Sequence, residues 1–370
     1  MIALAPSLLV LAALEIYFGI QLKKHGPYSY EYPRILPNAQ NKIGAKQLPT
    51  NLPPLAPLPI GTHSPSDYRP SAAFPIVNSG ALALLKPDWH MEHFRASVNG
   101  TAPIKVSANT DGFSRRISKN ASPNTRSFFI ALWGCSFTFG TNVDDSETLS
   151  SQIAEALPDT ATYNYGMHGG GPNDALLRFT LKPPKLEIKE TKGIGIYIFM
   201  DDQLKRLVGT MSYVGSWHRH TPLYEESGGA LVYRGTFSQA HPALYLLYRF
   251  LARSNILEYF AVDFPFVYHK KYAALAALHF KAIAQKFAEN FLGQKFVVVF
   301  FPGYEHYAEI LKPQLDKENI SYLDYSALPL DRLVKGPLKQ PDGHPMPEVY
   351  KFVARQIVRD LSQAGWIDNK

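Results

Sequence analysis

Five short apolar runs recur between residues 128 and 325, and glycine-containing or polar segments separate them. Runs of this length without strict alternation are typical of strands that are buried on both faces. They cover residues 128–134, 161–165, 195–200, 295–301 and 320–325. The segments between them predict helices at about 148–156, 175–179, 266–292, up to 318, and 348–361. This alternation predicts an α/β domain with a doubly wound, mostly parallel sheet.

The α/β rhythm is interrupted between about residues 205 and 265. Residues 223–234 have the pattern of a β-hairpin, and residues 241–260 have that of an aromatic-rich helix. We interpret this stretch as an insertion that covers a site or binds a partner.

The N-terminal residues 2–20 are apolar except for Ser7 and Glu15, and their number matches a bilayer span. We expect residues 1–22 to be a membrane anchor or an uncleaved signal. A buried or partner-packed helix is the alternative, and Glu15 weakens the span. Lys23 and Lys24 follow it, and by the positive-inside rule they favour a cytoplasmic location for the rest of the chain.

Proline dominates the next part of the chain, since 11 of the 29 prolines fall between Pro27 and Pro75. Such a composition is typical of an extended, partly polyproline spacer. Within residues 23–109 we therefore expect a linker followed by an N-terminal extension. The extension has a short helical piece after Ser79 and a strand at 104–107, and the main domain covers residues 110–370.

The net charge of +7 comes from scattered Lys and Arg, without a basic run or a stripe of basic and aromatic residues. This distribution argues against a nucleic-acid partner and indicates a solvated surface, with a basic face near an anionic membrane as the alternative. The single cysteine, Cys135, excludes an internal disulfide.

Ser136 follows the first apolar run, at a turn from a strand into a helix, where open α/β sheets place ligands. Its neighbour Cys135 is a second candidate nucleophile, although a small apolar residue that closes the strand is the simpler interpretation. We expect no cofactor. His90 and His93 would share one face of a helix, but without a neighbouring carboxylate or cysteine cluster we predict no metal site there.

Acidic residues occur at two further places, one at the end of a strand and one on a turn. Asp201 and Asp202 follow the run 195–200, where they are either site residues or N-caps of the next helix. Asp342 and His344 lie two apart on a Pro/Gly-rich turn before the last helix. Residues 217–220, which include His218 and His220, either line a pocket or lie exposed in a loop.

Four blocks in order, 134–140, 164–169, 199–202 and 342–345, resemble those of the SGNH hydrolase superfamily, the GDSL-type esterases and lipases. The resemblance covers roughly residues 110–361 and implies a flavodoxin-like, three-layer α/β/α fold. It also implies a nucleophile at Ser136, a base at His344 and an orienting acid at Asp342. Each block alone is a weak signal, and their order and spacing make the set specific.

The resemblance further implies an oxyanion hole made by the backbone N–H groups of Ser136 and Gly169 and by the side chain of Asp201. These roles follow general serine chemistry, in which a base activates the hydroxyl and preplaced donors stabilise the oxyanion. Asp201 departs from the family, which has asparagine there. It is either protonated, or turned away from the oxyanion, or a cause of impaired catalysis.

Cys135 stands where the family has aspartate, and the spacing Asp342-x-His344 is shorter than the common Asp-x-x-His. That spacing resembles membrane-linked acetyltransferase relatives. An α/β-hydrolase fits less well, because Thr138 occupies the second glycine position of its Gly-x-Ser-x-Gly elbow.

The sequence thus predicts a membrane-anchored serine esterase that removes acetyl or other small acyl groups from a glycan or envelope component. The alternatives are an O-acyltransferase with the same triad and a non-catalytic binding protein that retains the fold. The family habit of acting on envelope esters favours a periplasmic or extracellular domain, against the signal from Lys23 and Lys24.

Overall fold

The computed structural model describes residues 5–25, 76–79, 82–95, 104–121, 126–216, 218 and 220–367. The proline-rich linker expected between Gly26 and Pro75 lies outside these residues.

A five-stranded parallel sheet forms the centre of the chain. Its strands are β5 (Phe128–Gly134), β6 (Thr160–Gly166), β7 (Lys192–Phe199), β10 (Lys295–Phe300) and β11 (Ser321–Asp324). All four pairings are parallel, and the spatial order is β11-β10-β7-β5-β6. Numbered by their place in the chain, these strands have the order 2-1-3-4-5, which is that of the flavodoxin-like doubly wound fold. The predicted fold class is therefore confirmed.

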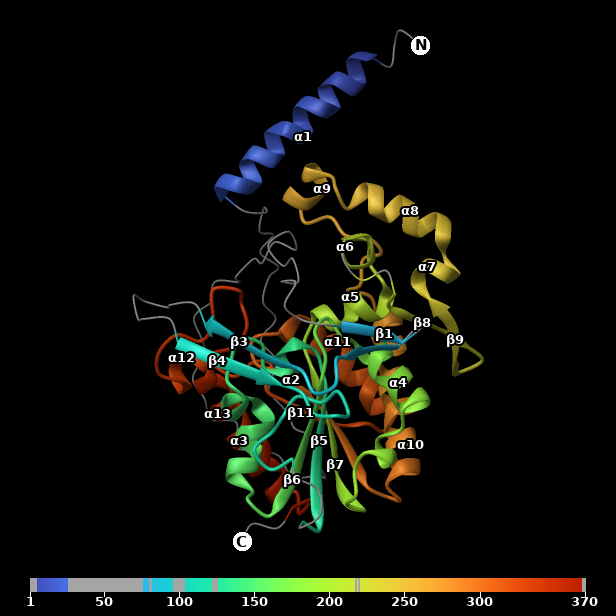
Figure 1. The fold of residues 1–370 in the computed structure, drawn as a ribbon. Helices are drawn as coiled ribbons and strands as arrows, with labels where there is room; N and C mark the ends of the chain where they lie inside the picture. Colours follow the sequence, from blue (N-terminus) through green and yellow to red (C-terminus); the bar gives the residue numbers. More distant parts are fainter. Residues whose placement is uncertain are drawn as a thin grey trace.

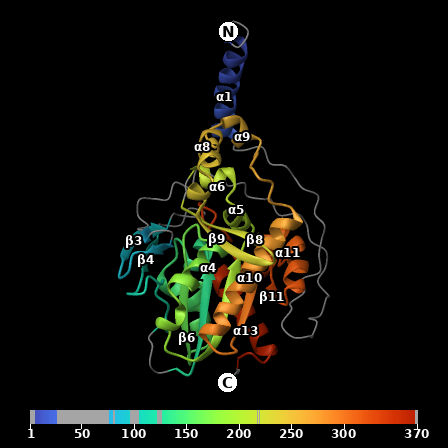
Figure 2. The same cartoon turned by 90° about the vertical axis from the view of Figure 1, so that its right-hand side faces the viewer.

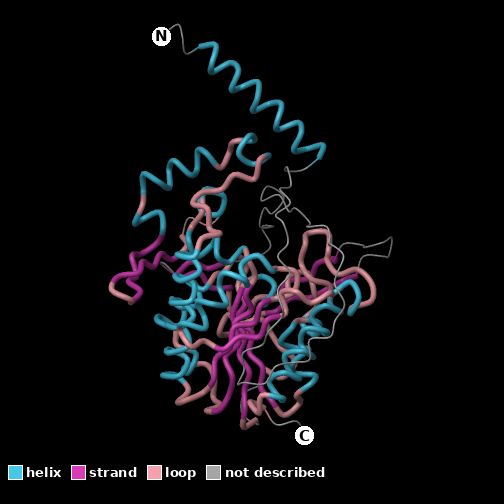
Figure 3. The backbone as a smooth tube through the Cα atoms, turned by 180° about the vertical axis from the view of Figure 1, so that it is seen from behind, coloured by secondary structure: helices cyan, strands magenta, loops and turns pink. Residues whose placement is uncertain are grey.

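Helices cover both faces of this sheet, as Figure 3 shows from behind. One core joins it to α4 (Pro172–Leu181), α10 (Lys270–Asn290) and α11 (Glu305–Lys317). The other joins it to α3 (Leu149–Ala156) and α13 (Pro347–Gln363). Alternate residues of β5 enter opposite cores: Phe129 and Trp133 face the first, while Ile130 and Leu132 face the second. Burial on both faces is why these runs lack polar alternation.

Shorter elements connect the layers. They are α2 (Ser136–Phe139), α12 (Leu330–Leu333) and two 3-10 turns, η1 (Asp145–Glu147) and η2 (Pro184–Leu186). The helix α2 lies at the carboxyl end of β5, and η1 leads into α3 (Figure 1).

The N-terminal extension forms two antiparallel strand pairs instead of the expected helical piece. One is β1 (Ile76–Ser79) with β2 (Leu82–Leu85), and the other is β3 (His90–Arg95) with β4 (Ile104–Asn109). The helical expectation was wrong because the apolar side chains of β2 pack on the main domain, so tertiary burial overrides local propensity.

The insertion contains more elements than its sequence indicated. After α5 (Asp202–Val208) come α6 (Met211–Ser216), the hairpin of β8 (Pro222–Ser227) and β9 (Ala230–Thr236), and α7 (Phe237–Ala240). The helix expected at 241–260 is two helices, α8 (Pro242–Leu251) and α9 (Asn255–Tyr259). They are separate because Ser254 caps the N-terminus of α9 through a hydrogen bond from the Leu257 N–H.

The N-terminal helix α1 (Ala5–His25) packs on α9 and projects from the end of the molecule that carries the insertion (Figures 1 and 2). Within the described ranges, no helix has both the length and the apolarity needed to cross a membrane. The expected anchor at residues 2–20 stays a prediction.

Candidate active site

Ser136 is the first residue of α2 and is 6% exposed. The turn that presents it depends on Gly134, whose φ of 147° lies in the region that favours glycine. A Cβ at this position would come within 2.2 Å of the Thr138 Oγ1 atom and 2.8 Å of the Ile198 carbonyl oxygen. Gly134 therefore allows the sharp turn at the carboxyl end of β5 that positions Ser136.

The next strand holds α2 closely. A Cβ on Gly166 would lie 2.2 Å from the backbone nitrogen of Phe139, so only glycine permits this approach. The buried Asn164 side chain donates to the Thr138 carbonyl at 2.8 Å and accepts from the Gly166 N–H at 2.9 Å. The second sequence block thus fixes the helix that begins with Ser136.

Asp342 and His344 form a hydrogen-bonded pair on a tight turn. The Nδ1 atom of His344 lies 2.9 Å from Oδ2 of Asp342, and the His344 backbone N–H donates to Oδ1 at 3.1 Å. Burial of the Asp342 carboxyl favours its neutral form, yet its pKa is below the ordinary value because of the hydrogen bonds and charge of His344. The buried Gln340 ties this turn to the Thr141 carbonyl at 3.3 Å.

This pair lies against the segment that carries Ser136. The Asn142 side-chain amide donates to Oδ2 of Asp342. The ring of Phe137 contacts the imidazole of His344, with 5.4 Å between the centroids. Residues about 200 positions apart are thereby brought together, and His344 is only 4% exposed.

A second histidine, His168, is buried in the same region. Its Nδ1 atom is 3.2 Å from Thr141 Oγ1, which in turn donates to the Ser136 carbonyl at 3.3 Å. Its ring packs on Phe139 with a centroid distance of 4.5 Å. Burial, followed by the nearby charge of His344, lowers the pKa of His168 well below its ordinary value, so its neutral form is favoured.

Side chains of α5 and of the insertion make hydrogen bonds to the loop that contains Gly169. Tyr213 Oη in α6 donates to the Gly169 carbonyl at 2.6 Å, and Arg206 in α5 donates to the Gly170 carbonyl at 3.1 Å. The carboxylate of Asp174 accepts from the Gly171 N–H at 2.8 Å. These bonds restrain the loop that carries the Gly169 N–H, one of the expected oxyanion donors.

Asp201 is 8% exposed, and its Oδ1 atom has no hydrogen-bond partner. Burial, reinforced by Asp202, raises the pKa of Asp201 well above its ordinary value, against the opposing effect of the Tyr307 backbone N–H. Burial therefore favours the protonated form of the Asp201 carboxyl. Asp201 is the N-cap residue of α5, as one of the two interpretations expected, but its side chain makes no capping hydrogen bond.

Arg116 is a site-supporting residue that the sequence did not reveal. Its guanidinium is fully buried and pairs with Asp145 at 2.6 Å. It also donates to the carbonyls of Val143, Gly140 and Ser107, at 2.9, 3.3 and 3.1 Å. These bonds tie the loop after α2 to β4, and a buried basic residue without a motif gives no signal in one sequence.

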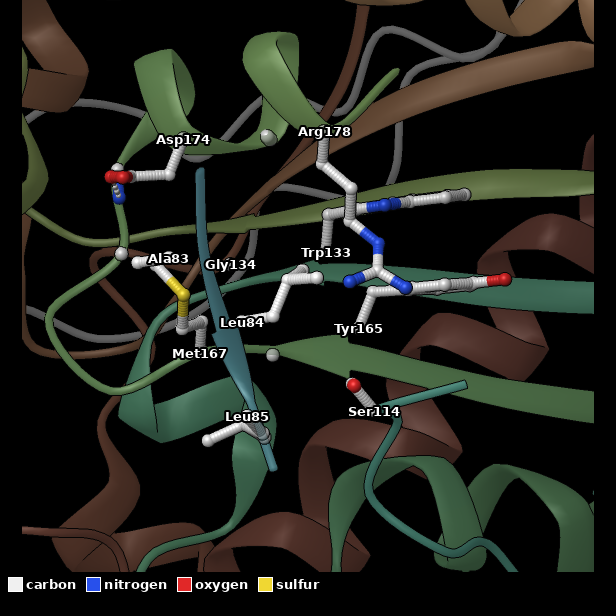
Figure 4. Close-up of a pocket in the computed structure, with 14 residues that line it drawn as sticks. Ala83, Leu84, Leu85, Ser114, Trp133, Gly134, Tyr165, Met167, Asp174 and Arg178 are labelled. Carbon is white, nitrogen blue, oxygen red and sulfur yellow. Dashed lines mark hydrogen bonds between the residues drawn. The ribbon is translucent and has the colours of Figure 1, made fainter. Parts of the chain in front are cut away.

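A narrow pocket borders the site through Gly134, Met167 and Gly170 (Figure 4). Its walls include the stacked rings of Trp133 and Tyr165, whose centroids are 5.0 Å apart. The strand β2 passes across it. Neither Ser136 nor His344 lines this pocket, so it adjoins the catalytic candidates without containing them.

The other candidate residues take structural positions. His90 and His93 lie on strand β3, so the helical arrangement that would place them on one face does not occur. Among the described residues, no cluster of His, Cys, Asp or Glu could hold a metal. Cys135 is fully buried, with Sγ 3.3 Å from Met200 Sδ. His218 lies in a loop but is buried, with its ring stacked on that of Tyr213 in α6.

No protein-family model and no curated protein sequence matches the chain. Among solved structures, it is similar to a lipolytic protein of the G-D-S-L family from Veillonella parvula DSM 2008 (TM-score 0.38, 9% identity, covering 64% of this chain and 99% of that one). It is also similar to a lipase/acylhydrolase from Enterococcus faecalis (TM-score 0.36, 13% identity, 66% and 98%). A third is an acetyl xylan esterase from the rumen bacterium Butyrivibrio proteoclasticus (TM-score 0.39, 9% identity, 66% and 66%).

Proposed function

We propose that the chain is a serine ester hydrolase with Ser136 as nucleophile, His344 as general base and Asp342 as the acid that orients it. The single observation that carries this proposal is the 2.9 Å hydrogen bond between His344 Nδ1 and Asp342 Oδ2, beside the segment that begins with Ser136. A carboxylate partner at Nδ1 makes that nitrogen the donor, which leaves Nε2 as the proton acceptor of the neutral ring.

In the proposed reaction, Ser136 Oγ attacks the ester carbonyl while His344 Nε2 takes the hydroxyl proton. The tetrahedral intermediate collapses to an acyl-enzyme, and the protonated His344 gives its proton to the leaving alcohol. A water molecule then attacks the acyl-enzyme with His344 again as base, which releases the carboxylic acid and restores Ser136. Asp342 remains ionised and stabilises the imidazolium throughout.

The proposed oxyanion donors are the backbone N–H groups of Ser136 and Gly169 together with the side chain of Asp201. A neutral carboxyl can donate a hydrogen bond, whereas an ionised one would repel the developing oxyanion. The raised pKa of Asp201 supports the donating form. The hydrogen bonds of Tyr213 and Arg206 to the Gly169–Gly170 carbonyls support a preorganised loop.

For the substrate, we propose small acyl esters, with acetyl groups on a glycan or envelope component as the simplest case. The resemblance in the sequence supports this class. We further propose that residues 2–20 attach the domain to a membrane and that it acts in the periplasm or outside the cell.

The same residues could transfer the acyl group to a sugar hydroxyl instead of to water. The Asp342-x-His344 spacing favours this second candidate. Product analysis with an acyl donor, with and without a glycan acceptor, separates the two: a transferase forms an acylated acceptor faster than it releases free acid.

The test is hydrolysis of p-nitrophenyl acetate by the full chain and by Ser136→Ala, with the exposed Ser227→Ala as matched control. We expect Ser136→Ala to lower kcat by at least about 10³-fold, and Ser227→Ala to leave the rate unchanged. A fluorophosphonate probe should label the wild type and not Ser136→Ala. Equal rates in all three proteins, without labelling, would instead identify a non-catalytic binding protein.

A further inference from the structure

The helix α1 exposes apolar side chains over most of its circumference. Its exposed large apolar residues are Val10 (60%), Leu11 (51%), Leu14 (42%), Ile16 (66%), Tyr17 (53%) and Ile20 (46%). With 3.6 residues per turn, these positions span about 220° of the helix circumference, and Glu15 and Gly19 lie in the remaining arc. An exposed apolar face of this width requires an apolar surrounding.

The remaining side of α1 packs on the insertion. The carboxylate of Glu15 accepts from Ser254 Oγ at 2.5 Å and from the Asn255 backbone N–H at 2.6 Å. It thereby caps the N-terminus of α9, and its negative charge lies at the positive end of that helix. The rings of Phe18 and Tyr259 meet at 4.8 Å. The only acid of α1 is therefore satisfied within the protein, and α1 is joined to the insertion.

The insertion adds a second exposed apolar face. In α8, Tyr248 is buried on the side facing α6, while Leu246, Leu247 and Phe250 are 62%, 50% and 75% exposed. Phe250 lies four residues after Leu246 and three after Leu247, so the helical repeat places these side chains in one outward stripe. Contiguous exposed apolar surface of this kind marks an interaction site in a water-soluble domain.

These two faces share one end of the molecule. Figures 1 and 2 show α1, α8 and α9 together, beyond the carboxyl ends of the sheet strands and away from the C-terminus. Exposed basic residues accompany them: Lys23 and Lys24 near the end of α1, and Arg249 and Arg253 along and after α8.

We propose that α1 and the outward stripe of α8 form one lipid-contact surface that seats the domain on an anionic phospholipid bilayer. A protein groove covers one side of a helix, whereas the exposed apolar side chains of α1 span more than half of its circumference, which a bilayer can cover. The basic residues then meet anionic headgroups. The insertion thereby supplies α8 as a second lipid contact and α9 as the attachment point of α1.

The proposal is independent of the esterase assignment because it is tested by binding. The full chain carries a single cysteine, Cys135, which is fully buried, so a cysteine placed at the surface can be labelled selectively. An environment-sensitive fluorophore is attached to Phe250→Cys, and to Leu292→Cys as matched control. Leu292 is 88% exposed and precedes β10, at the amino ends of the strands.

Vesicles of phosphatidylcholine containing phosphatidylglycerol are then added. We expect the emission of the Phe250→Cys label to rise and to be quenched by nitroxide-labelled lipid, while the Leu292→Cys label does not respond. A chain that floats with the vesicles without any response at Phe250→Cys would overturn the proposal, and so would a chain that does not bind them. If the emission of the Phe250→Cys label rises with protein concentration in the absence of vesicles, a second copy of the chain covers α8, and this result would also overturn the proposal.

A second comparison measures the strength of the contact. Leu247→Gln with Phe250→Gln should lower vesicle partitioning about tenfold or more, since binding grows with the apolar area that enters the interface. The matched control, Leu186→Gln with Leu292→Gln, changes side chains of similar type and exposure and should leave partitioning within about twofold. Equal losses in the two pairs would refute a specific role for α8.

Discussion

Arg116→Met removes the buried charge that joins β4 to the loop following α2. The native guanidinium is fully buried and makes an ion pair with Asp145 at 2.6 Å. It also lies over the Phe139 ring, 4.7 Å from its centroid. Methionine retains much of the apolar contact and loses every hydrogen bond. The variant therefore tests the polar contribution of Arg116 with little change in packing.

The expected loss follows from the groups that would remain. Breaking a buried ion pair by removing one partner costs about 3–5 kcal/mol, because the other charge stays behind. Asp145 retains hydrogen bonds from the backbone and the side chain of Asn109 and is partly exposed, which favours the lower end. The carbonyls of Val143 and Ser107 would each lose a donor, which adds a smaller cost. We expect the free energy of unfolding to fall by about 4 kcal/mol.

Denaturant unfolding of the full chain measures this change, with Arg234→Met as matched control. Arg234 pairs with Glu225 on the surface at 2.9 Å, with both side chains more than 40% exposed. Its loss should cost at most about 1 kcal/mol. The double variant Arg116→Met with Asp145→Asn should recover part of the loss, since no buried carboxylate remains unpaired.

The same variants also report on the site. At temperatures where Arg116→Met is folded, we expect its esterase rate to be reduced, because the loop from Gly140 to Asp145 adjoins the helix that begins with Ser136. An unfolding free energy within about 1 kcal/mol of the wild type would refute the reasoning that this buried network organises the site.

Three further predictions concern the oxyanion side of the site. In the wild type, the esterase rate should fall as pH rises through the raised pKa of Asp201, because the carboxyl becomes charged. Asp201→Asn should retain its rate in that alkaline range, and identical pH–rate profiles would contradict a donor role. Tyr213→Phe removes the 2.6 Å hydrogen bond to the Gly169 carbonyl and should lower kcat about tenfold with little change in KM, whereas the more exposed Tyr233→Phe should change neither. Burial raises the pKa of Asp174 from 3.8 to about 7. Between these two pH values the folded chain keeps a proton that the unfolded chain releases, so the free energy of unfolding should fall by up to about 4 kcal/mol as pH rises from about 4 to about 7. In Asp174→Asn the fall measured by denaturant unfolding at pH 5 and pH 8 should be smaller than in the wild type, with the part due to the raised pKa of Asp201 remaining. An unchanged fall would count against the raised pKa of Asp174.

The sequence by itself was sufficient for the central sheet. Runs such as 128–134 are apolar throughout because both faces of the strand are buried, and this local property needs no knowledge of distant contacts. The glycine-flanked Ser136 and the Asp342–His344 turn were also visible, because their chemistry is carried by short motifs.

The N-terminal extension and the insertion were less accessible to sequence reasoning. Strand β2 has a short apolar pattern that fits either a helix or a strand, and only its packing on the main domain decides between them. The break between α8 and α9 depends on Ser254 as an N-cap and on Glu15 from the other end of the chain.

The types, order and periodicity of the residues can be read from the sequence directly, so they were sufficient to predict the strands, the candidate nucleophile and the acid–base pair. Burial and long-range contact arise only when the chain folds. The tertiary structure therefore decided that Asp201 favours its neutral form, that Arg116 ties β4 to the loop after α2, and that Tyr213 of the insertion holds the Gly169 carbonyl. Each of these depends on the dielectric surroundings or on a partner that is distant in sequence, which a single sequence does not encode locally.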